Sequence, residues 1–358
     1  MKHTPLFSLH ENSGAKMGEF AGYDMPLFYP LGVMKEHLHT RNSAGLFDIS
    51  HMVHMEVTGS EASQLIERAC PYDASNQPIG QARYTFFLNE NAGVIDDLII
   101  TRLESTRYLI VSNAGCADKD IAHINGLAEN FNATVEVIPR GFLALQGPKA
   151  ESVLDRLGYA VRDLAFMTAI EPKAGWFLSR TGYTGEDGFE IAMPVEETEA
   201  FAQKLLESAD VELIGLGARD SLRLEAGLSL YGQDLDDSVT PHEAGLLWAI
   251  PKPLRQGGAF IGADALAEKI EAGRLRKRVG LRPTGKMPVR AGAKLINENG
   301  EDIGKVTSGG FGPSFEGPVA LGLIDMKAAD QPIFAEVRGK QIPMEVHSLP
   351  FVPHNYKR

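Results

Sequence analysis

Cysteine is nearly absent from this sequence, whose 358 residues include only Cys70 and Cys116. The two lie far apart and form no C-x-x-C pair, which argues against a disulfide framework and a zinc ribbon. Long apolar runs are also absent, and none approaches the roughly 18 residues that a membrane helix requires. The residues after Met1 resemble neither a signal peptide nor a transit presequence. These absences predict a cytoplasmic protein with no membrane partner and no metal site of standard spacing.

Basic residues are scarce relative to acidic ones. Lys and Arg number 35 against 47 Asp and Glu, so the formal net charge is −12. Because nucleic-acid phosphates need a basic face, a chain this acidic is expected to have no nucleic-acid partner. A small anionic ligand remains compatible, since one or two arginines in a pocket can bind it.

The rest of the composition is ordinary for a globular protein, with 44% hydrophobic and 23% charged residues. At roughly 150 residues per domain, the length predicts two or three domains. Over residues 1–275, periodicity predicts helices near 32–42, 196–208 and 216–226 and a three-strand meander over 82–112. Strands and helices mixed in this way are typical of an α+β body, here with two interleaved subdomains.

The pattern changes after residue 275. Residues 276–358 contain short apolar strands at regular spacing, and little helix is visible. Asn299-Gly300 is a strong signal for a hairpin turn between two of these strands. The segment 276–358 is therefore predicted to form a small all-β domain, either a sandwich or a barrel.

Two adjacent carboxylates, Asp96 and Asp97, interrupt an otherwise apolar strand that runs from Val94 to Leu103. Side chains alternate across a strand, so the two carboxylates point to opposite faces. A buried Asp is rare unless it is paired or functional. One carboxylate is therefore expected to face a cavity and the other a turn or solvent. An edge strand with both acids in solvent fits the pattern about equally well.

Two further segments have both a structural and a ligand-binding interpretation. The glycine-rich segment 182–190 lies between two predicted strands, and composition alone favours a tight turn over a ligand site. Arg219 and Arg223 lie one helical turn apart and share a helix face. That face is either salt-bridged and solvated or, beside the glycine-rich segment, a clamp for a carboxylate.

Two other basic features favour a structural interpretation. His51 stands in a predicted strand from Phe47 to Val57 and has no second histidine at metal spacing, so it is interpreted as a structural histidine with satisfied ring nitrogens. Residues 274–278 (Arg-Leu-Arg-Lys-Arg) form the densest basic run of the chain. A solvated strand start is slightly favoured for this run over a docking patch for an acidic partner.

Many segments of this chain match one known family in order along the sequence. They are residues 4–6, 14–17, 20–26, 46–52, 94–99, 144–148, 181–190, 218–227, 307–309 and 350–353. The chain resembles the aminomethyltransferase, or T-protein, family of the glycine cleavage system. Departures are few: Tyr23 stands where the family usually has tryptophan, and His242 where an aliphatic residue is usual. Neither position is assigned to the chemistry.

The resemblance implies a three-domain cloverleaf around a central channel that holds tetrahydrofolate, with 276–358 as the third domain. It also implies the reaction. An aminomethyl group on the lipoyl arm of the H-protein is attacked by a folate nitrogen, and ammonia leaves. The products are 5,10-methylenetetrahydrofolate and dihydrolipoyl H-protein. Tetrahydrofolate is then a co-substrate, the lipoylated H-protein is the partner, and neither a metal nor a covalent enzyme intermediate is required.

The resemblance further implies the site residues. Asp97 takes the catalytic position beside the folate nitrogens, Glu190 and Arg219 bind the folate, and a tyrosine next to the C-terminus, Tyr356, contributes. Four more residues lie on segments expected to line the channel: Tyr84, Met52, Asn113 and Arg290. The chemistry of these residue types is suitable. A carboxylate can accept two adjacent N–H groups of a pterin, and arginine and tyrosine can donate to an anionic glutamate tail.

Two alternatives stay open at this point. A folate-dependent demethylase of the same fold would have the same pocket and a different donor, a sulfonium or N-methyl compound. A folate-binding regulator or iron–sulfur cluster-assembly factor would bind without turnover. The cluster-assembly relatives carry the signature K-G-C-Y-x-G-Q-E. The corresponding residues 181–187 of this chain contain no cysteine, which disfavours that branch.

Overall fold

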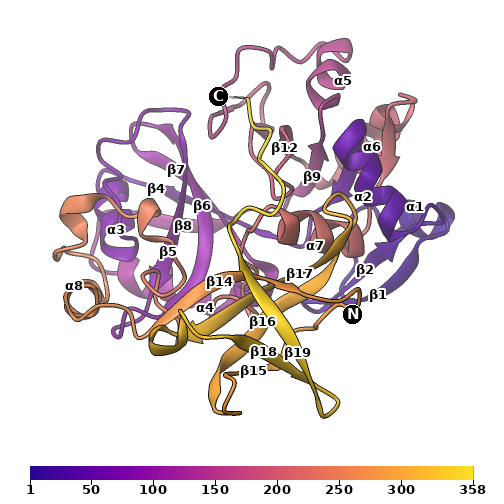
Figure 1. The fold of residues 1–358 in the computed structure, drawn as a ribbon. Coiled ribbons are helices and arrows are strands. Elements are labelled where there is room, and N and C mark those ends of the chain that lie inside the picture. The colour runs from indigo at the N-terminus through magenta and orange to yellow at the C-terminus, as the bar shows by residue number, and fades with distance from the viewer. Residues whose placement is uncertain (358) are drawn as a thin grey trace.

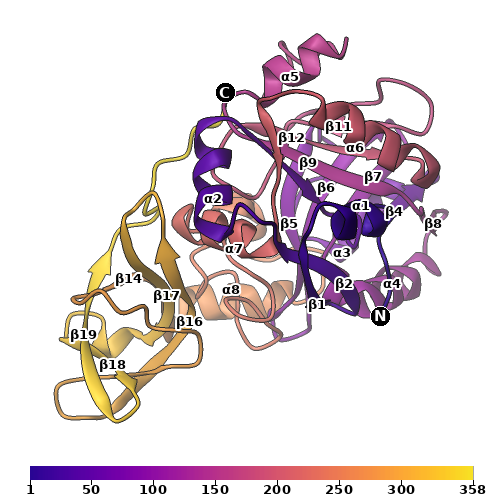
Figure 2. The same ribbon diagram turned by 90° about the vertical axis from the view of Figure 1, so that its right-hand side faces the viewer.

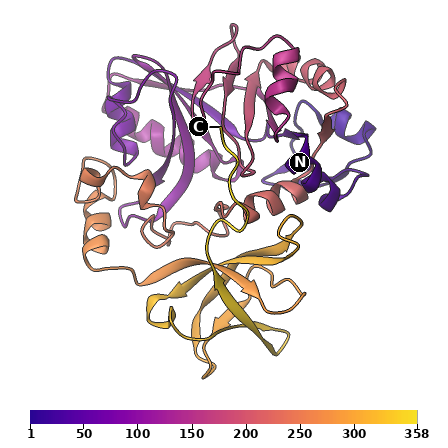
Figure 3. The ribbon, with the colours of Figure 1, turned by 45° about the horizontal axis from the view of Figure 1, so that its top comes forward.

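Three lobes of β-structure meet at the centre of the molecule, as Figure 3 shows for residues 1–357, which the computed structural model describes. Two lobes are β-sheets packed against helices, and the third is a closed barrel. The predicted α+β body with a C-terminal β-domain is confirmed. Among the described residues, no helix combines the length and apolar character needed to cross a membrane.

The first lobe is a five-stranded sheet. Its strands, in spatial order, are β5 (Ala82–Leu88), β6 (Val94–Glu104), β7 (Arg107–Ser112), β4 (Val53–Thr58) and β8 (Thr134–Val137). The predicted meander over 82–112 is therefore confirmed as β5, β6 and β7. Helices α3 (Ala62–Ala69) and α4 (Ala117–Ala128) pack on one face through Leu65, Ile66 and Ile124. Against the other side lie residues 235–266, which include the start of α8 (Ala263–Glu271).

The second lobe is a six-stranded sheet. Its strands, in spatial order, are β10 (Ala169–Ile170), β11 (Phe177–Ser179), β12 (Gly188–Met193), β9 (Gly141–Gln146), β3 (Ala44–Asp48) and β13 (Val211–Leu213). Helices α5 (Ala150–Arg156) and α6 (Thr198–Leu206) bury their apolar faces against it. The expected single strand from Phe47 to Val57 is wrong, because β3 ends at Asp48 and a turn precedes β4. That turn carries His51 and Met52.

A smaller group of elements flanks this lobe. It consists of helix α1 (Phe7–Asn12), the hairpin β1 (Lys16–Phe20) and β2 (Tyr23–Phe28), and helices α2 (Val33–Asn42) and α7 (Leu216–Glu225). The predicted helices near 32–42 and 216–226 are confirmed as α2 and α7. Helix α7 packs against α2, β2 and the barrel, which places it where the lobes join (Figure 2).

The third lobe is a closed six-stranded barrel, so the choice between sandwich and barrel is decided for the barrel. Around the barrel the strands are β14 (Arg276–Pro283), β17 (Gly317–Asp325), β16 (Asp302–Gly312), β15 (Lys294–Ile296), β18 (Ile333–Val337) and β19 (Lys340–His347). The chain then leaves the barrel and runs up between the other two lobes (Figure 1). There Asn355 N donates to Gly185 O at 2.8 Å, which anchors the tail beside the glycine-rich segment.

Buried charges hold the barrel to the body at the C-terminal end of α7. Glu225 Oε1 accepts hydrogen bonds from Ser314 N at 2.8 Å and Phe315 N at 3.0 Å, both on a barrel loop. Its second oxygen accepts from His37 Nε2 and Arg41 Nη2 of α2, each at 3.0 Å. These donors outweigh the effect of burial and lower the pKa of Glu225 to about 2, so the carboxylate stays ionised.

Candidate active site

A cavity of about 860 Å³ lies where the three lobes meet. Its walls come from β5 and β6 of the first lobe, β12 of the second, helix α7, residues 226–231, β14 of the barrel and the C-terminal tail. The volume falls in the range of small-molecule sites, which are concave and mostly apolar with a few placed polar groups. A ligand here contacts all three lobes at once.

Seven of the eight site residues expected from the resemblance line this cavity. They are Asp97, Glu190, Arg219, Tyr356, Tyr84, Met52 and Asn113. Arg290 is the exception: it does not line this cavity, and its folate-binding role stays a prediction. Its side chain is exposed on the barrel, and its guanidinium contacts only Gly309 O, at 3.5 Å, among the contacts found for the described residues.

The Asp97 side chain projects from β6 into the cavity, where two neighbouring side chains donate hydrogen bonds to it. Tyr84 Oη donates to Asp97 Oδ2 at 2.9 Å, and Asn113 Nδ2 donates to Oδ1 at 3.1 Å. Burial, followed by the charge of neighbouring Asp96, raises the pKa of Asp97 to about 7. A carboxylate with such a pKa can accept a proton at neutral pH far better than an ordinary Asp.

Asp96 occupies the opposite face of β6, as the alternation of the strand predicts. Of the two surroundings expected for it, solvent is wrong, because Asp96 is 0% exposed, and the turn is confirmed, because Asp96 faces Asn113 and the turn that follows it. The alternative of an edge strand is also wrong, since β6 lies between β5 and β7. Asn113 bridges the two carboxylates: its backbone N donates to Asp96 Oδ2 at 3.0 Å and its Nδ2 to Asp96 Oδ1 at 2.9 Å.

Glu190 and Arg219 form a second polar group in the same cavity. Thr181 Oγ1 donates to Glu190 Oε2 at 2.5 Å, while burial raises the pKa of Glu190. The guanidinium of Arg219 lies 4.8 Å from the centre of the Tyr183 ring and lowers the pKa of Glu190 again through its charge. No hydrogen bond from another described residue reaches Glu190 Oε1, which leaves this oxygen available to a donor on a ligand.

Aromatic rings form the apolar walls. Tyr84 stacks on Trp248 with ring centres 5.6 Å apart, and Tyr356 stacks on Phe166 at 4.0 Å. Both pairs line the cavity, and Trp248 is 68% exposed at its mouth. Flat walls of this kind suit a planar, partly aromatic ligand.

The glycine-rich segment forms the predicted tight turn and also reaches the cavity wall. Gly185 has φ +80°, a conformation that requires glycine, and a Cβ there would lie 2.9 Å from the Ala226 Cβ. The turn is therefore a packing requirement. The same segment also brings Gly182 and Tyr183 to the cavity wall.

The arginine pair separates in the structure. Arg219 lies at the cavity, whereas Arg223 is buried in an ion pair with Asp234 at 2.7 Å. One arginine therefore fits the clamp interpretation and the other the salt-bridge interpretation. The two coexist because Arg223 lies one turn further along α7, where Asp234 and Ser308 of the barrel surround its guanidinium.

Two basic features were interpreted incorrectly. Arg278 of the run 274–278 lines the cavity, where its Nη2 donates to Gly227 O at 3.0 Å, and Arg276 pairs with Glu243 at 2.8 Å. The run is therefore not one solvated surface. His51 also lines the cavity, and its Nδ1 has no hydrogen-bond partner within residues 1–357. Burial, followed by the charge of Arg219, lowers the pKa of His51 to about 4.

Sequence reasoning missed several wall residues, notably Tyr183, Trp248 and Arg278. Tyr183 carried a signal, because it stands inside the glycine-rich segment that had already been singled out. Trp248 and Arg278 carried none, since only the packing of the lobes brings their segments to the cavity.

Chemically, the cavity combines a proton acceptor with a binding group. Asp97, held in place by Tyr84 and Asn113, is a carboxylate that can accept a proton. Glu190 and Arg219 supply a hydrogen-bond acceptor and a fixed positive charge. A ligand with N–H donors and a nucleophilic atom that must lose a proton fits this arrangement.

Comparisons with known proteins agree over the whole chain. Residues 6–253 match the GCVT N-terminal domain model, and residues 276–353 match that of the glycine cleavage T-protein C-terminal barrel domain. The crystal structure of glycine cleavage system aminomethyltransferase T from Bartonella henselae is 52% identical, with a TM-score of 0.98 over 100% of this chain and 99% of that one.

Curated relatives from distant organisms show the same similarity. The mitochondrial aminomethyltransferase of Flaveria pringlei is 40% identical and aligns with 99% of this chain and 91% of its own length. The mitochondrial aminomethyltransferase of Dictyostelium discoideum is 39% identical and aligns with 100% of this chain and 94% of its own length. With both family models in place and relatives this similar over nearly full length, the chain belongs to the glycine cleavage T-protein family.

Proposed function

We propose that this protein is a tetrahydrofolate-dependent aminomethyltransferase of glycine cleavage. It transfers the methylene of an aminomethyl group on the lipoyl arm of H-protein to tetrahydrofolate, releasing ammonia and forming 5,10-methylenetetrahydrofolate. The observation that carries the proposal is the Asp97 carboxylate, held at the cavity by Tyr84 and Asn113 in one chamber with Glu190 and Arg219. The partner is the lipoylated H-protein, whose arm must reach Asp97 through the cavity.

The residues present suit a reduced folate. The Oε1 of Glu190, at the cavity wall, can accept from the N–H groups on the pyrimidine edge of a pterin, and the aromatic walls suit its flat ring. The folate supplies the nitrogen that accepts the methylene group. Asp97 removes the proton that this nitrogen must lose, and Tyr84 and Asn113 hold the Asp97 carboxylate still while it does so.

The direct test is ammonia release from aminomethylated, lipoylated H-protein. Release that requires both tetrahydrofolate and the loaded carrier supports the proposal, and omission of either reactant is the control. Demethylation of an N-methyl or sulfonium donor without any reaction of H-protein would instead identify a demethylase of the same fold. Folate binding without turnover of any donor would favour a binding protein.

Replacing Glu190 tests the folate-binding role. Glu190→Ala should weaken tetrahydrofolate binding by about 1–3 kcal/mol, the scale for losing a charged hydrogen-bond partner. Glu190→Gln keeps one acceptor oxygen and should lose less. Titration calorimetry measures both, with the exposed Glu196→Ala on the neighbouring turn as the control. Equal affinities for the Ala variant and wild type would contradict the assignment.

The raised pKa of Asp97 predicts a pH dependence of turnover. Asp97 accepts a proton only when it is ionised, so kcat/KM should fall about tenfold per pH unit below its pKa. With that pKa at about 7, the acid limb should lie near neutrality. The residual rate of Asp97→Asn should lack this limb, and a limb that persists in this variant would belong to another group.

Two narrower points stay proposals. We place the division between body and barrel at residues 275 and 276, because β14 and the barrel-domain match both begin at residue 276. A cytoplasmic location stays a prediction of the sequence, while the curated relatives carry a mitochondrial designation in their names.

A further inference from the structure

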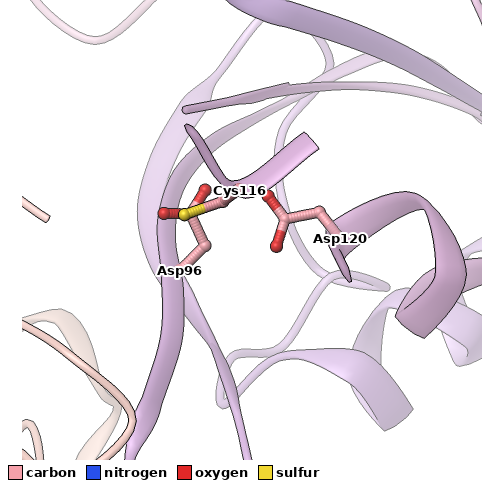
Figure 4. Close-up of side chains that lie close together, drawn as sticks. All are labelled: Asp96, Cys116 and Asp120. Carbon is pink, nitrogen blue, oxygen red and sulfur yellow. The ribbon is translucent and has the colours of Figure 1, made fainter. Parts of the chain in front are cut away.

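On the face of β6 opposite Asp97, three buried side chains converge on one point. They are Asp96 of β6, Cys116 of the short turn η1 (Ala114–Cys116) and Asp120 of α4, as Figure 4 shows. One polar atom from each lies within 4.8 Å of the others. The proposed chemistry of the cavity uses neither Cys116 nor Asp120, although both are 2% exposed or less.

The two carboxyl groups of this cluster have opposite hydrogen-bond environments. Asp96 accepts from the backbone N and the Nδ2 of Asn113, and the Cys116 thiol contacts it as well. Over residues 1–357 neither oxygen of Asp120 accepts a hydrogen bond of ordinary geometry, and the Ser112 hydroxyl is the one neutral donor that interacts with its carboxyl group. A buried carboxylate with so few donors costs several kcal/mol, so a proton must satisfy Asp120.

The asymmetry decides where that proton resides. When two adjacent carboxyl groups share one proton, the group with more donors stays ionised and the other becomes the acid. Asp96 has the donors, so Asp120 is the acid and its O–H points at Asp96. Burial, followed by the charge of Asp96, raises the pKa of Asp120 to about 10, in agreement with this assignment.

Resting on the proposed function, we propose that Asp120 is a positioning residue: it holds a proton that it donates to Asp96, and so keeps Asp96 an anion behind Asp97. The anionic Asp96 orients Asn113, which in turn donates to Asp97 Oδ1 at 3.1 Å. The charge of Asp96 also makes Asp97 a stronger base, since a like charge nearby favours the protonated form of Asp97.

Charged and titratable groups from every element around Asp120 affect where the proton of this cluster resides. Asp96 faces it from β6, Cys116 from η1 and Cys70 from the end of α3, while Lys119 is its neighbour on α4. The Ser112 hydroxyl of β7 faces the same carboxyl group and, through its interaction with it, opposes the rise in the pKa of Asp120. Lys119 is the one cation of this set, and its Nζ bonds to Tyr231 Oη instead.

The decisive comparison is Asp120→Asn against Asp120→Ala. The Asn amide can donate to Asp96 as the acid does, so kcat should stay near its wild-type value. The Ala variant removes this donor, so Asp96 and, through Asn113, Asp97 lose part of their orientation. Its kcat should fall about tenfold, with little change in the KM for folate.

A spectroscopic measurement tests the protonated acid independently of turnover. Infrared difference spectra, recorded about one unit above the pKa of Asp97, should show a carboxylic-acid C=O band in the wild type. The band should be absent from Asp120→Asn. The exposed Asp118→Asn on the same helix is the control and should retain it.

Three results would contradict the proposed role of Asp120. Equal loss of activity in Asp120→Asn and Asp120→Ala would overturn the proposal, because only the Ala variant lacks a donor. An acid band that survives in Asp120→Asn would also overturn it, as would a divalent cation bound stoichiometrically to the purified protein. If the Ala variant does not fold, Asp120→Leu replaces it as a variant that cannot donate. Absence of ammonia release would refute the proposed function but leave the infrared result interpretable.

Discussion

Asp97→Asn should fold normally and lose about 10²–10⁴-fold in kcat for ammonia release, the range for removing a positioned general base. Asn is nearly the same size as Asp and can still occupy the place between Tyr84 and Asn113. It cannot accept the proton that the folate nitrogen must lose. Steady-state ammonia release and the thermal midpoint, measured on the same preparations, separate lost chemistry from lost structure.

Two controls frame this result. Glu104→Gln removes an exposed carboxylate at the end of the same strand and should leave turnover close to wild type. Asp96→Asn should lose less activity than Asp97→Asn, because the Asp96 carboxylate does not line the cavity. Retention of more than about a tenth of the wild-type kcat by Asp97→Asn would lie outside the expected range and reject the proton-transfer role.

Arg223→Met should lower the free energy of unfolding by about 3–5 kcal/mol, because it leaves a buried charge without its partner. Arg223 is 1% exposed and pairs with Asp234 at 2.7 Å. It also donates to Ser308 Oγ of the barrel at 2.8 Å. The loss should therefore affect both the segment 228–234, which contributes to the cavity wall, and the contact between α7 and β16. Chemical denaturation measures it.

An exposed ion pair provides the matched control. Arg156 contacts Asp210 at 2.9 Å and is 53% exposed at its side chain, so Arg156→Met should cost at most about 1 kcal/mol. The double variant Arg223→Met/Asp234→Leu should recover much of the loss, since it removes the uncompensated charge. A cost for Arg223→Met no larger than that for Arg156→Met would show that the buried pair contributes little.

The spacing of apolar residues predicted the secondary structure best in long elements with a regular helix or strand period. The meander over 82–112 and helix α7 follow directly from apolar spacing and turn residues. The hairpin β1–β2 and the short strand β13 were not predicted. Strand β13, of three residues, forms by pairing with β3, which lies far away in the sequence, so its own residues carry little signal.

Sequence predicted the position of a site residue where that position depends on neighbouring residues or where the residue belongs to a motif that resembles the family. Alternation along β6 correctly placed Asp96 and Asp97 on opposite faces. It did not show that Asp96 is buried, because that depends on β5, β7 and α4 packing around the strand. Arg290 lies outside the cavity for a related reason: its position along the sequence does not tell which side of the barrel faces the cavity.

The sequence by itself determined the fold class and the all-β nature of residues 276–358. Both depend on period and turn residues, which act over a few neighbouring positions. Its resemblance to the family proposed the residues that carry the chemistry. Only the tertiary structure decided that Arg278 lines the cavity, that Arg223 is buried and that Asp120 meets Asp96. These outcomes depend on which surfaces pack together in the folded chain. Such contacts join residues that are far apart in the sequence, and no local pattern predicts them.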